Sequence, residues 1–170
     1  METKIIHITK ENIEATAKEA TDVWEQGGLV AFPTETVYGL GGNGLNKEAS
    51  KKIYAAKGRP SDNPLILHIA DMEQFYPLIK TDNAKIIARA EALADVFWPV
   101  PLTMILPKAD NIPYETTGGL DTVAIRMPSH LVARALLQEC KMPIAAPSAN
   151  LSGRPSPTSA SHVIEDMNDH

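Results

Sequence analysis

The apolar residues of this sequence fall into two kinds of pattern that alternate along the chain. One has the spacing of a helix face, as between Thr9, the expected N-cap, and Trp24. The other is a short run of branched or aromatic residues, typical of a buried strand. The first kind predicts helices over residues 9–24, 47–57, 82–97 and 131–140, and another that begins near Ser159. The second predicts strands over residues 4–8, 29–32, 65–69, 102–106, 122–127 and 144–146.

This alternation is typical of an α/β domain. The stretch from Leu102 to Met127 has room for an antiparallel pair, so we expect a mixed sheet rather than a purely parallel one. The chain has 170 residues, of which 44% are hydrophobic, and this is enough for the core of one domain. No linker composition divides it, so residues 1–170 are treated as a single domain.

Charge and cysteine content narrow the classes of function. The formal net charge is −5, so the chain lacks the general basic field on which nonspecific nucleic-acid binding relies, and a polyanion would need a local basic patch. The single cysteine, Cys140, falls in an apolar helical pattern and is expected to be a packed thiol. Residues 1–7 lack a signal-peptide core, and no apolar run has membrane length. We therefore expect a cytoplasmic protein without membrane contact.

Three polar segments without apolar periodicity hold the candidate chemistry, namely residues 33–38, 57–64 and 147–158. The tetrapeptide Gly-Arg-Pro-Ser occurs in two of them, at residues 58–61 and 153–156. Arginine offers a fixed fork of donors, proline stiffens the backbone beside it, and glycine lets a ligand come close. Two such loops suggest an anion held from two sides.

Standard nucleotide and hydrolase motifs do not explain these segments. Residues 39–44 fit G-x-G-x-x-G, but residues 33–38 separate them from the preceding strand, unlike a dinucleotide-binding unit. The stretch from Pro33 to Gly44 is expected to be irregular. The sequence has no G-K-[ST] after these glycines, no G-x-S-x-G, and neither H-E-x-x-H nor paired cysteines for zinc.

Four basic residues each have a structural and a functional interpretation. Lys57 and Arg59 could serve only the helix dipole, but the glycine and prolines around Arg59 fix a loop that the dipole does not require. His68 lies on a predicted strand, where a core histidine bonded to the backbone is the favoured interpretation. Arg126 also lies on a strand and needs an anion when buried, either a bound carboxylate or phosphate or a structural Asp or Glu.

The segment of residues 147–158 leaves the end of a predicted strand, where open α/β sheets bind ligands. A Ser/Pro-rich linker is the alternative, but Ala149 and Leu151 favour an ordered loop.

Taken together, four segments in this order resemble the YrdC-type L-threonylcarbamoyladenylate synthases. They are residues 33–40, residues 57–60 with 63–65, residues 122–128, and residues 147–150. The resemblance implies a twisted, open sheet flanked by helices and curved around a deep, positively lined cavity. It also implies that L-threonine, bicarbonate or carbon dioxide, and ATP with Mg²⁺ give threonylcarbamoyl-AMP and pyrophosphate. A separate transferase system would then place the group on the adenosine beside the anticodon of tRNA.

The resemblance assigns roles to individual residues. Thr36, His68 and Arg126 would contact threonine, with Arg126 bidentate to its carboxylate. Ala146 would add backbone atoms. The ATP contacts would be Lys57, Arg59, Asn63, Thr122, Ser148, Asn150 and Ser156, with Arg154 as a further contact. Lys57 and Arg59 would be the catalytic pair, because neutralising charge on the phosphates needs no nucleophilic side chain. No side chain is assigned to a metal.

Two departures from the family pattern stand out. Val100 occupies a position where glycine is usual, and the sequence stops at His170, before a Ser-Thr-Val-Val-Asp segment that normally completes the nucleotide site. We therefore expect a domain that lacks its C-terminal part. The alternative from another class is an RNA-binding module of the same fold with weak tRNA binding. Another is the carbamoyladenylate-forming domain of hydrogenase maturation proteins, which the missing acylphosphatase and zinc-finger modules make less favoured.

Overall fold

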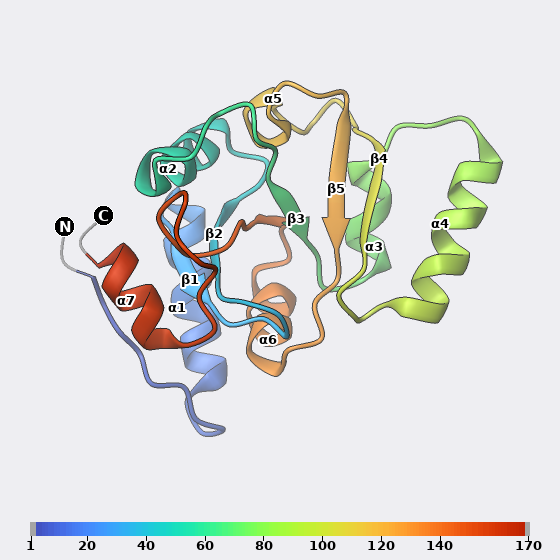
Figure 1. Ribbon diagram of the computed structural model, residues 1–170. Coiled ribbons are helices and arrows are strands. Elements are labelled where there is room, and N and C mark those ends of the chain that lie inside the picture. Colours follow the sequence, from blue (N-terminus) through green and yellow to red (C-terminus); the bar gives the residue numbers. More distant parts are fainter. Residues whose placement is uncertain (1–2, 169–170) are drawn as a thin grey trace.

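The structure is a computed structural model that describes residues 3–168, and its helices and strands are interleaved (Figure 1). The helices are α1 (Ile13–Glu25), α2 (Lys47–Lys57), α3 (Met72–Phe75), α4 (Ala84–Phe97), α5 (Tyr114–Thr117), α6 (Leu131–Cys140) and α7 (Ala160–Met167), with one 3-10 turn, η1 (Tyr76–Leu78). The strands are β1 (Val30–Phe32), β2 (Gly39–Asn43), β3 (Ile66–His68), β4 (Thr103–Pro107), β5 (Thr122–Arg126) and β6 (Ile144–Ala145). The predicted α/β class is confirmed.

The described strands form one mixed, open sheet in the order β1-β2-β6-β3-β5-β4. Within it, β3 and β5 run parallel, and the other neighbouring pairs are antiparallel. The antiparallel pair expected between Leu102 and Met127 is β4 with β5, in which Thr103 lies opposite Arg126. The prediction of a mixed sheet is therefore confirmed.

Of residues 33–44, which we expected to be irregular, residues 33–38 are so, but Gly39–Asn43 form an inner strand, β2. A side chain on Gly41 would lie 2.7 Å from both Ile144 Cγ2 and Phe32 Cε1. A side chain on Gly44, just after the strand, would lie 2.3 Å from Leu67 Cδ2. Close packing requires glycine at these positions, although strand propensities score a run of glycines as irregular structure.

The strand predicted at residues 4–8 was wrong, because these residues form no strand in the structure. The helix that follows begins at Ile13, with Asn12 rather than Thr9 in the N-cap position. The Asn12 side chain accepts from the Thr9 N–H at 2.7 Å and donates to the His7 carbonyl at 2.9 Å. These local bonds lead the chain directly into α1.

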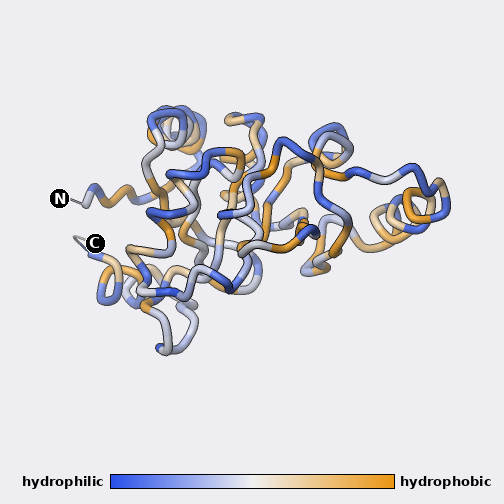
Figure 2. The backbone as a smooth tube through the Cα atoms, turned by 90° about the horizontal axis from the view of Figure 1, so that it is seen from above, coloured by the Kyte–Doolittle hydropathy of each residue, from blue (hydrophilic) through white to orange (hydrophobic). Residues whose placement is uncertain are grey.

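Two large apolar clusters cover the two faces of the sheet. One includes Leu67 and Ile125 and packs with α4 and the α3 region, and the other includes Trp24 and Ile144 and packs with α1 and α6, which contact each other. Figure 2 shows α4 at one end of the molecule, with hydrophobic and hydrophilic residues mixed along it. Cys140 lies in the second cluster and is 7% exposed, which confirms a packed thiol, and burial raises its pKa to about 11.

In the part of the chain that the structure describes, no helix has the length and apolar character needed to cross a membrane.

Candidate active site

The sheet brings His68 and Arg126 together at the carboxyl ends of its parallel pair. The two residues lie opposite each other in the register of β3 and β5, so their side chains share a face. Leu67 and Ile125, one position earlier, belong to the core on the other face. The strand alternation therefore places both candidate residues on the face that Phe32 also covers, where the Phe32 and His68 rings meet edge to face at 6.3 Å.

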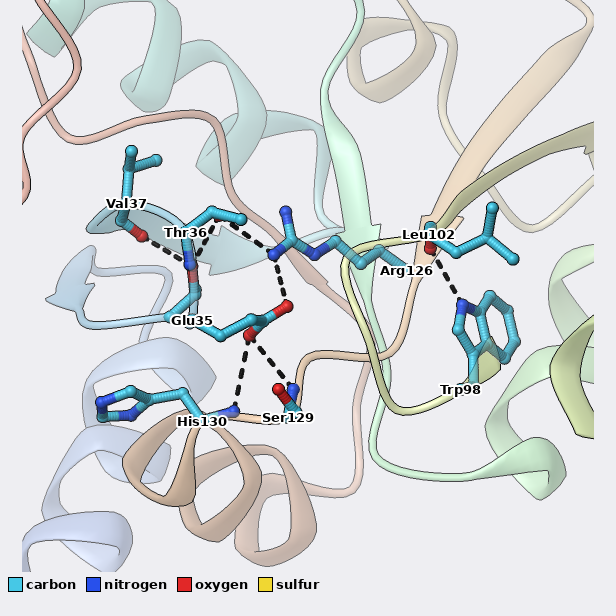
Figure 3. Close-up of polar contacts among 9 residues, drawn as sticks. Glu35, Thr36, Val37, Trp98, Leu102, Arg126, Ser129 and His130 are labelled. Atoms are coloured by element: carbon cyan, nitrogen blue, oxygen red, sulfur yellow. Dashed lines mark hydrogen bonds and ion pairs between the residues drawn. The ribbon is translucent and has the colours of Figure 1, made fainter. Parts of the chain in front are cut away.

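Arg126 lies in a polar network with the loop between β1 and β2 (Figure 3). Its Nη2 donates to Glu35 Oε1, in an ion pair, and to Thr36 Oγ1 at 3.0 Å. The side chains of Arg126 and Glu35 are only 12% and 16% exposed. The anion that the sequence required for a buried arginine is thus a structural glutamate, one of the two alternatives left open.

His68 is 4% exposed, and its Nδ1 lies 3.1 Å from the Ile66 carbonyl oxygen. Because a carbonyl only accepts, Nδ1 carries the hydrogen of the neutral ring. Burial, and next the positive charge of Arg126, lower the pKa of His68 from 6.5 to about 4. The backbone-bonded core histidine favoured from sequence is confirmed, and the ring is neutral at physiological pH.

We expect the His68 ring to remain neutral in an NMR titration from about pH 8 down to about pH 5. Its folded pKa of about 4 lies below the ordinary 6.5. As the pH falls from about 6.5 to about 4, the unfolded chain therefore takes up this proton before the folded protein does, and the free energy of unfolding decreases. The Cε1–H shift, assigned with a His68→Asn variant, measures the midpoint. A midpoint at the ordinary value would contradict the assignment.

The first Gly-Arg-Pro-Ser loop is held in shape by hydrogen bonds from its own arginine. Gly58 ends α2 with φ of 59°, a left-handed conformation that glycine adopts without strain. Arg59 Nη2 then donates to Asn63 Oδ1 at 2.7 Å and to the Pro64 carbonyl at 3.1 Å, and Nε donates to the Asn63 carbonyl at 3.2 Å. Arg59 and Asn63, both predicted ATP contacts, are therefore bonded to each other. Burial lowers the pKa of Arg59.

Lys57 points inward from the end of α2 and is only 2% exposed. Its Nζ donates to the carbonyl oxygens of Ser148 and Asn150, and its own carbonyl accepts from the Ser152 N–H at 2.8 Å. Burial, and next the charge of Arg59, lower the pKa of Lys57 to about 8. Lys57 thus joins the loop of residues 57–64 to the loop of residues 147–158.

Asn150 holds the last loop in shape. Its Nδ2 donates to the carbonyls of Leu151 at 2.8 Å and Arg154 at 2.9 Å. Its Oδ1 is buried and has no hydrogen-bond partner among the described residues. The loop is therefore ordered, as predicted, and it leaves one buried acceptor open.

The second Gly-Arg-Pro-Ser loop differs from the first. Arg154 Nη1 donates to Asp166 Oδ1 on α7 at 2.6 Å, while Asp166 Oδ2 accepts from the Leu151 N–H at 3.2 Å. Ser156, two residues on, is exposed. The guanidinium of this loop is thus directed to α7, so the two loops do not hold one anion from two sides in the same way.

The predicted site residues fall into three places. Thr36, His68 and Arg126 lie at the carboxyl ends of β3 and β5. Arg59, Asn63 and Thr122 lie toward the amino ends of the same strands, where Thr122 is exposed. Ala146 donates to the Ile66 carbonyl at 3.0 Å, also at the amino end of β3, and Lys57 bonds to the carbonyls of Ser148 and Asn150 in the last loop, which also holds Ser156.

The deep cavity implied by the resemblance stays a prediction. One groove of about 760 Å³ lies between residues 8–10, α1 and α6, and one of about 300 Å³ lies between α4 and β4. Neither is lined by a predicted site residue.

Comparison with known proteins identifies the family of the chain. The Sua5/YciO/YrdC family model, described as telomere recombination, matches residues 22–170. The chain belongs to this family. Its match to the model includes all the predicted site residues.

Individual family members are closely similar to the chain. A threonylcarbamoyl-AMP synthase of Pyrococcus abyssi is 55% identical over 97% of this chain and 47% of the relative. One of Bacillus subtilis is 56% identical over 88% of this chain and 42% of the relative. The structure of P. abyssi Sua5 complexed with L-threonine superposes with a TM-score of 0.84, at 54% identity, over 95% of this chain and 45% of that one. The chain thus spans less than half the length of these relatives.

Val100, the departure noted from sequence, lies in a hydrogen-bonded turn between α4 and β4. The Val100 carbonyl accepts from the Leu102 N–H at 2.7 Å, and the Leu102 carbonyl accepts from Trp98 Nε1 at 2.9 Å (Figure 3). Lys141 is the one non-glycine residue with positive φ among those described, so Val100 has an ordinary backbone conformation.

Sequence reasoning missed two carboxylates of this Sua5/YciO/YrdC domain. Glu35 lies in the segment of residues 33–40 and was assigned no role, although the need of Arg126 for an anion was the signal that could have found it. Asp166, the partner of Arg154, lies on α7, where no pattern marked it.

Proposed function

We propose that this chain carries the substrate site of an L-threonylcarbamoyladenylate synthase, which forms threonylcarbamoyl-AMP and pyrophosphate from L-threonine, bicarbonate or carbon dioxide, and ATP. One observation carries the proposal. Thr36, His68 and Arg126 converge in a chain that is 54% identical to a Sua5 whose structure contains L-threonine. A cation can pair with the carboxylate of an amino acid, and a hydroxyl and a neutral imidazole can hydrogen-bond to its amine and hydroxyl groups.

In this proposal, the threonine carboxylate binds Arg126 and the neutral His68 ring faces the bound amino acid. A neutral ring matters because a second cation beside Arg126 would hold the substrate carboxylate more strongly without helping the amine to react. The low pKa of His68, about 4, therefore suits a binding rather than a proton-transfer role.

ATP would lie toward the amino ends of β3 and β5. Arg59 supplies positive charge there, held by Asn63, and Thr122, Ser148 and Ser156 supply hydroxyls. The open Oδ1 of Asn150 is an acceptor, so it fits a ribose hydroxyl, an adenine N–H or a water on Mg²⁺ rather than a phosphate oxygen. No cluster of three His, Cys, Asp or Glu suited to a metal occurs among the described residues, so Mg²⁺ would arrive on the ATP phosphates.

The bond changes ask little covalent chemistry of the protein. The threonine amine adds to carbon dioxide and loses one proton to give a carbamate. A carbamate oxygen attacks the α-phosphorus of ATP, and the bond from that phosphorus to the bridging oxygen breaks to release pyrophosphate. Arg59 would stabilise the charge on the departing phosphates, and Lys57 would hold the loop of Ser148 and Asn150 beside it. The product would pass to a tRNA threonylcarbamoyl transferase in the cytoplasm.

A pyrophosphate-release assay with ATP and bicarbonate, with threonine present or omitted, tests this function. Threonine-dependent release by this chain, with the full-length P. abyssi relative as positive control, is the expected result. Release that does not need threonine, or salt-sensitive tRNA binding without any release, would instead favour another function, the latter an RNA-binding module.

A further inference from the structure

Glu35 has no part in the proposed chemistry, yet its carboxylate is bound from two sides (Figure 3). Oε1 pairs with Arg126 Nη2. Oε2 accepts from the Ser129 N–H at 3.1 Å and the His130 N–H at 3.4 Å, where the chain enters α6. Burial favours the neutral acid, but the hydrogen bonds from Arg126 and the backbone outweigh it and lower the pKa of Glu35. Glu35 is therefore an anion with a fixed orientation.

This orientation decides which donors of Arg126 remain for a ligand. A guanidinium has two edges that offer a pair of parallel donors, Nε with Nη2 and Nη1 with Nη2. The two hydrogens of Nη2 go to Glu35 and Thr36. Both edges thus lose a donor, while Nε is buried without a partner among the described residues. A substrate carboxylate then meets Nη1, which neither partner takes, instead of the bidentate contact expected from sequence.

The hydrogen bonds of the loop between β1 and β2 also determine which hydroxyl groups donate and which accept. Thr34 Oγ1 donates its one hydrogen to the Val37 carbonyl at 2.7 Å. The contact of 3.1 Å between the Thr34 and Thr36 hydroxyls must therefore be donated by Thr36. Thr36 accepts from Arg126 and has no hydrogen left, so it offers a ligand only a lone pair.

We propose that Glu35 is a positioning residue of the threonine subsite. This assignment rests on the proposed function, and it names the substrate group that the subsite selects. By anchoring Arg126 to the start of α6, Glu35 keeps Nη2 directed at Thr36 and keeps the Thr36 oxygen an acceptor. The subsite then binds a carboxylate at Nη1 and a donor, the amine of an α-amino acid, at Thr36.

A carboxylate at position 35 is needed for this arrangement. In Glu35→Gln, the amide can still accept from Arg126, but its NH₂ group then faces the Ser129 and His130 N–H groups, donor against donor. Arg126 also loses its counter-charge at a site that is largely buried. The guanidinium would then turn, and Thr36 would lose its defined polarity.

Calorimetric binding of L-threonine and of ATP to the wild type, Glu35→Gln and Glu35→Asp tests the assignment, with Glu14→Gln, at an exposed position of α1, as the matched control. Glu35→Gln should weaken threonine binding about 10-fold, as expected for loss of one charge-assisted bond, and change ATP binding less than about 2-fold. Glu35→Asp keeps the charge on a shorter arm and should lie between the two. Thr36→Val should lose threonine affinity, whereas Thr36→Ser should keep it.

The outcomes separate the two proposals. Wild-type affinity in Glu35→Gln, or equal weakening toward threonine and ATP, overturns the role of Glu35 and leaves the proposed function standing. A wild type that binds no threonine overturns both. Should Glu35→Gln give no folded protein, the comparison of Glu35→Asp with the wild type decides the question by the same threonine-to-ATP ratio.

Discussion

Arg126→Ala should reduce threonine-dependent pyrophosphate release by about 100-fold or more, because it removes the one cation at the proposed carboxylate site. Truncating one member of a buried charge pair costs about 2–5 kcal/mol, since the other charge stays buried and unpaired. Here Glu35 would be left uncompensated beside the incoming carboxylate, and the two anions would repel each other. Steady-state release at varied threonine measures the effect, which should appear chiefly in KM for threonine.

Two further variants make the Arg126 result specific. Arg89→Ala removes an exposed arginine of α4, remote from β3 and β5, and should leave release unchanged. Arg126→Lys keeps the charge but offers a point donor in place of a planar fork, so it should recover only part of the activity. Release by Arg126→Ala at the rate of the Arg89→Ala control would rule out Arg126 as the carboxylate-binding residue.

The extent to which the fold could be predicted depended on how far each element rests on its own apolar pattern. α2 and α6 lie where their apolar spacing placed them, because amphipathic helices carry their burial face in the sequence. β2 was missed because its glycines are selected by neighbours such as Ile144 and Leu67, which are far away in the chain. The strand expected at residues 4–8 failed because these residues lie at the surface and pair with neither edge strand, β1 or β4.

The candidate site could be predicted residue by residue but not bond by bond. Residue type and strand position pointed to Arg126 and showed that it needed an anion. The choice of Glu35 as that anion depends on a loop that meets β5 from 91 positions away. Likewise, the two Gly-Arg-Pro-Ser loops look identical in sequence, but Arg59 bonds to its own loop and Arg154 to α7.

Lys57→Met should lower the free energy of unfolding by about 2–4 kcal/mol, because the carbonyls of Ser148 and Asn150 would lose their shared donor. An unpaired buried acceptor costs about 1–3 kcal/mol, and methionine can fill the space but not donate. Urea unfolding measures the loss as a lower midpoint at an unchanged slope. Pyrophosphate release should fall as well, since the same carbonyls shape the loop that holds Ser148 and Asn150.

Lys51→Met on the same helix is the control for Lys57→Met. Lys51 is exposed and pairs only with Glu48, one turn earlier, so its loss should cost less than about 0.5 kcal/mol. A comparable small cost for Lys57→Met, with release abolished, would mean that the ammonium acts on the triphosphate and not on the loop. We expect Lys57→Met to lower both the stability and the rate of pyrophosphate release. An amine that is 2% exposed and bonded to two carbonyls acts through the backbone that it holds.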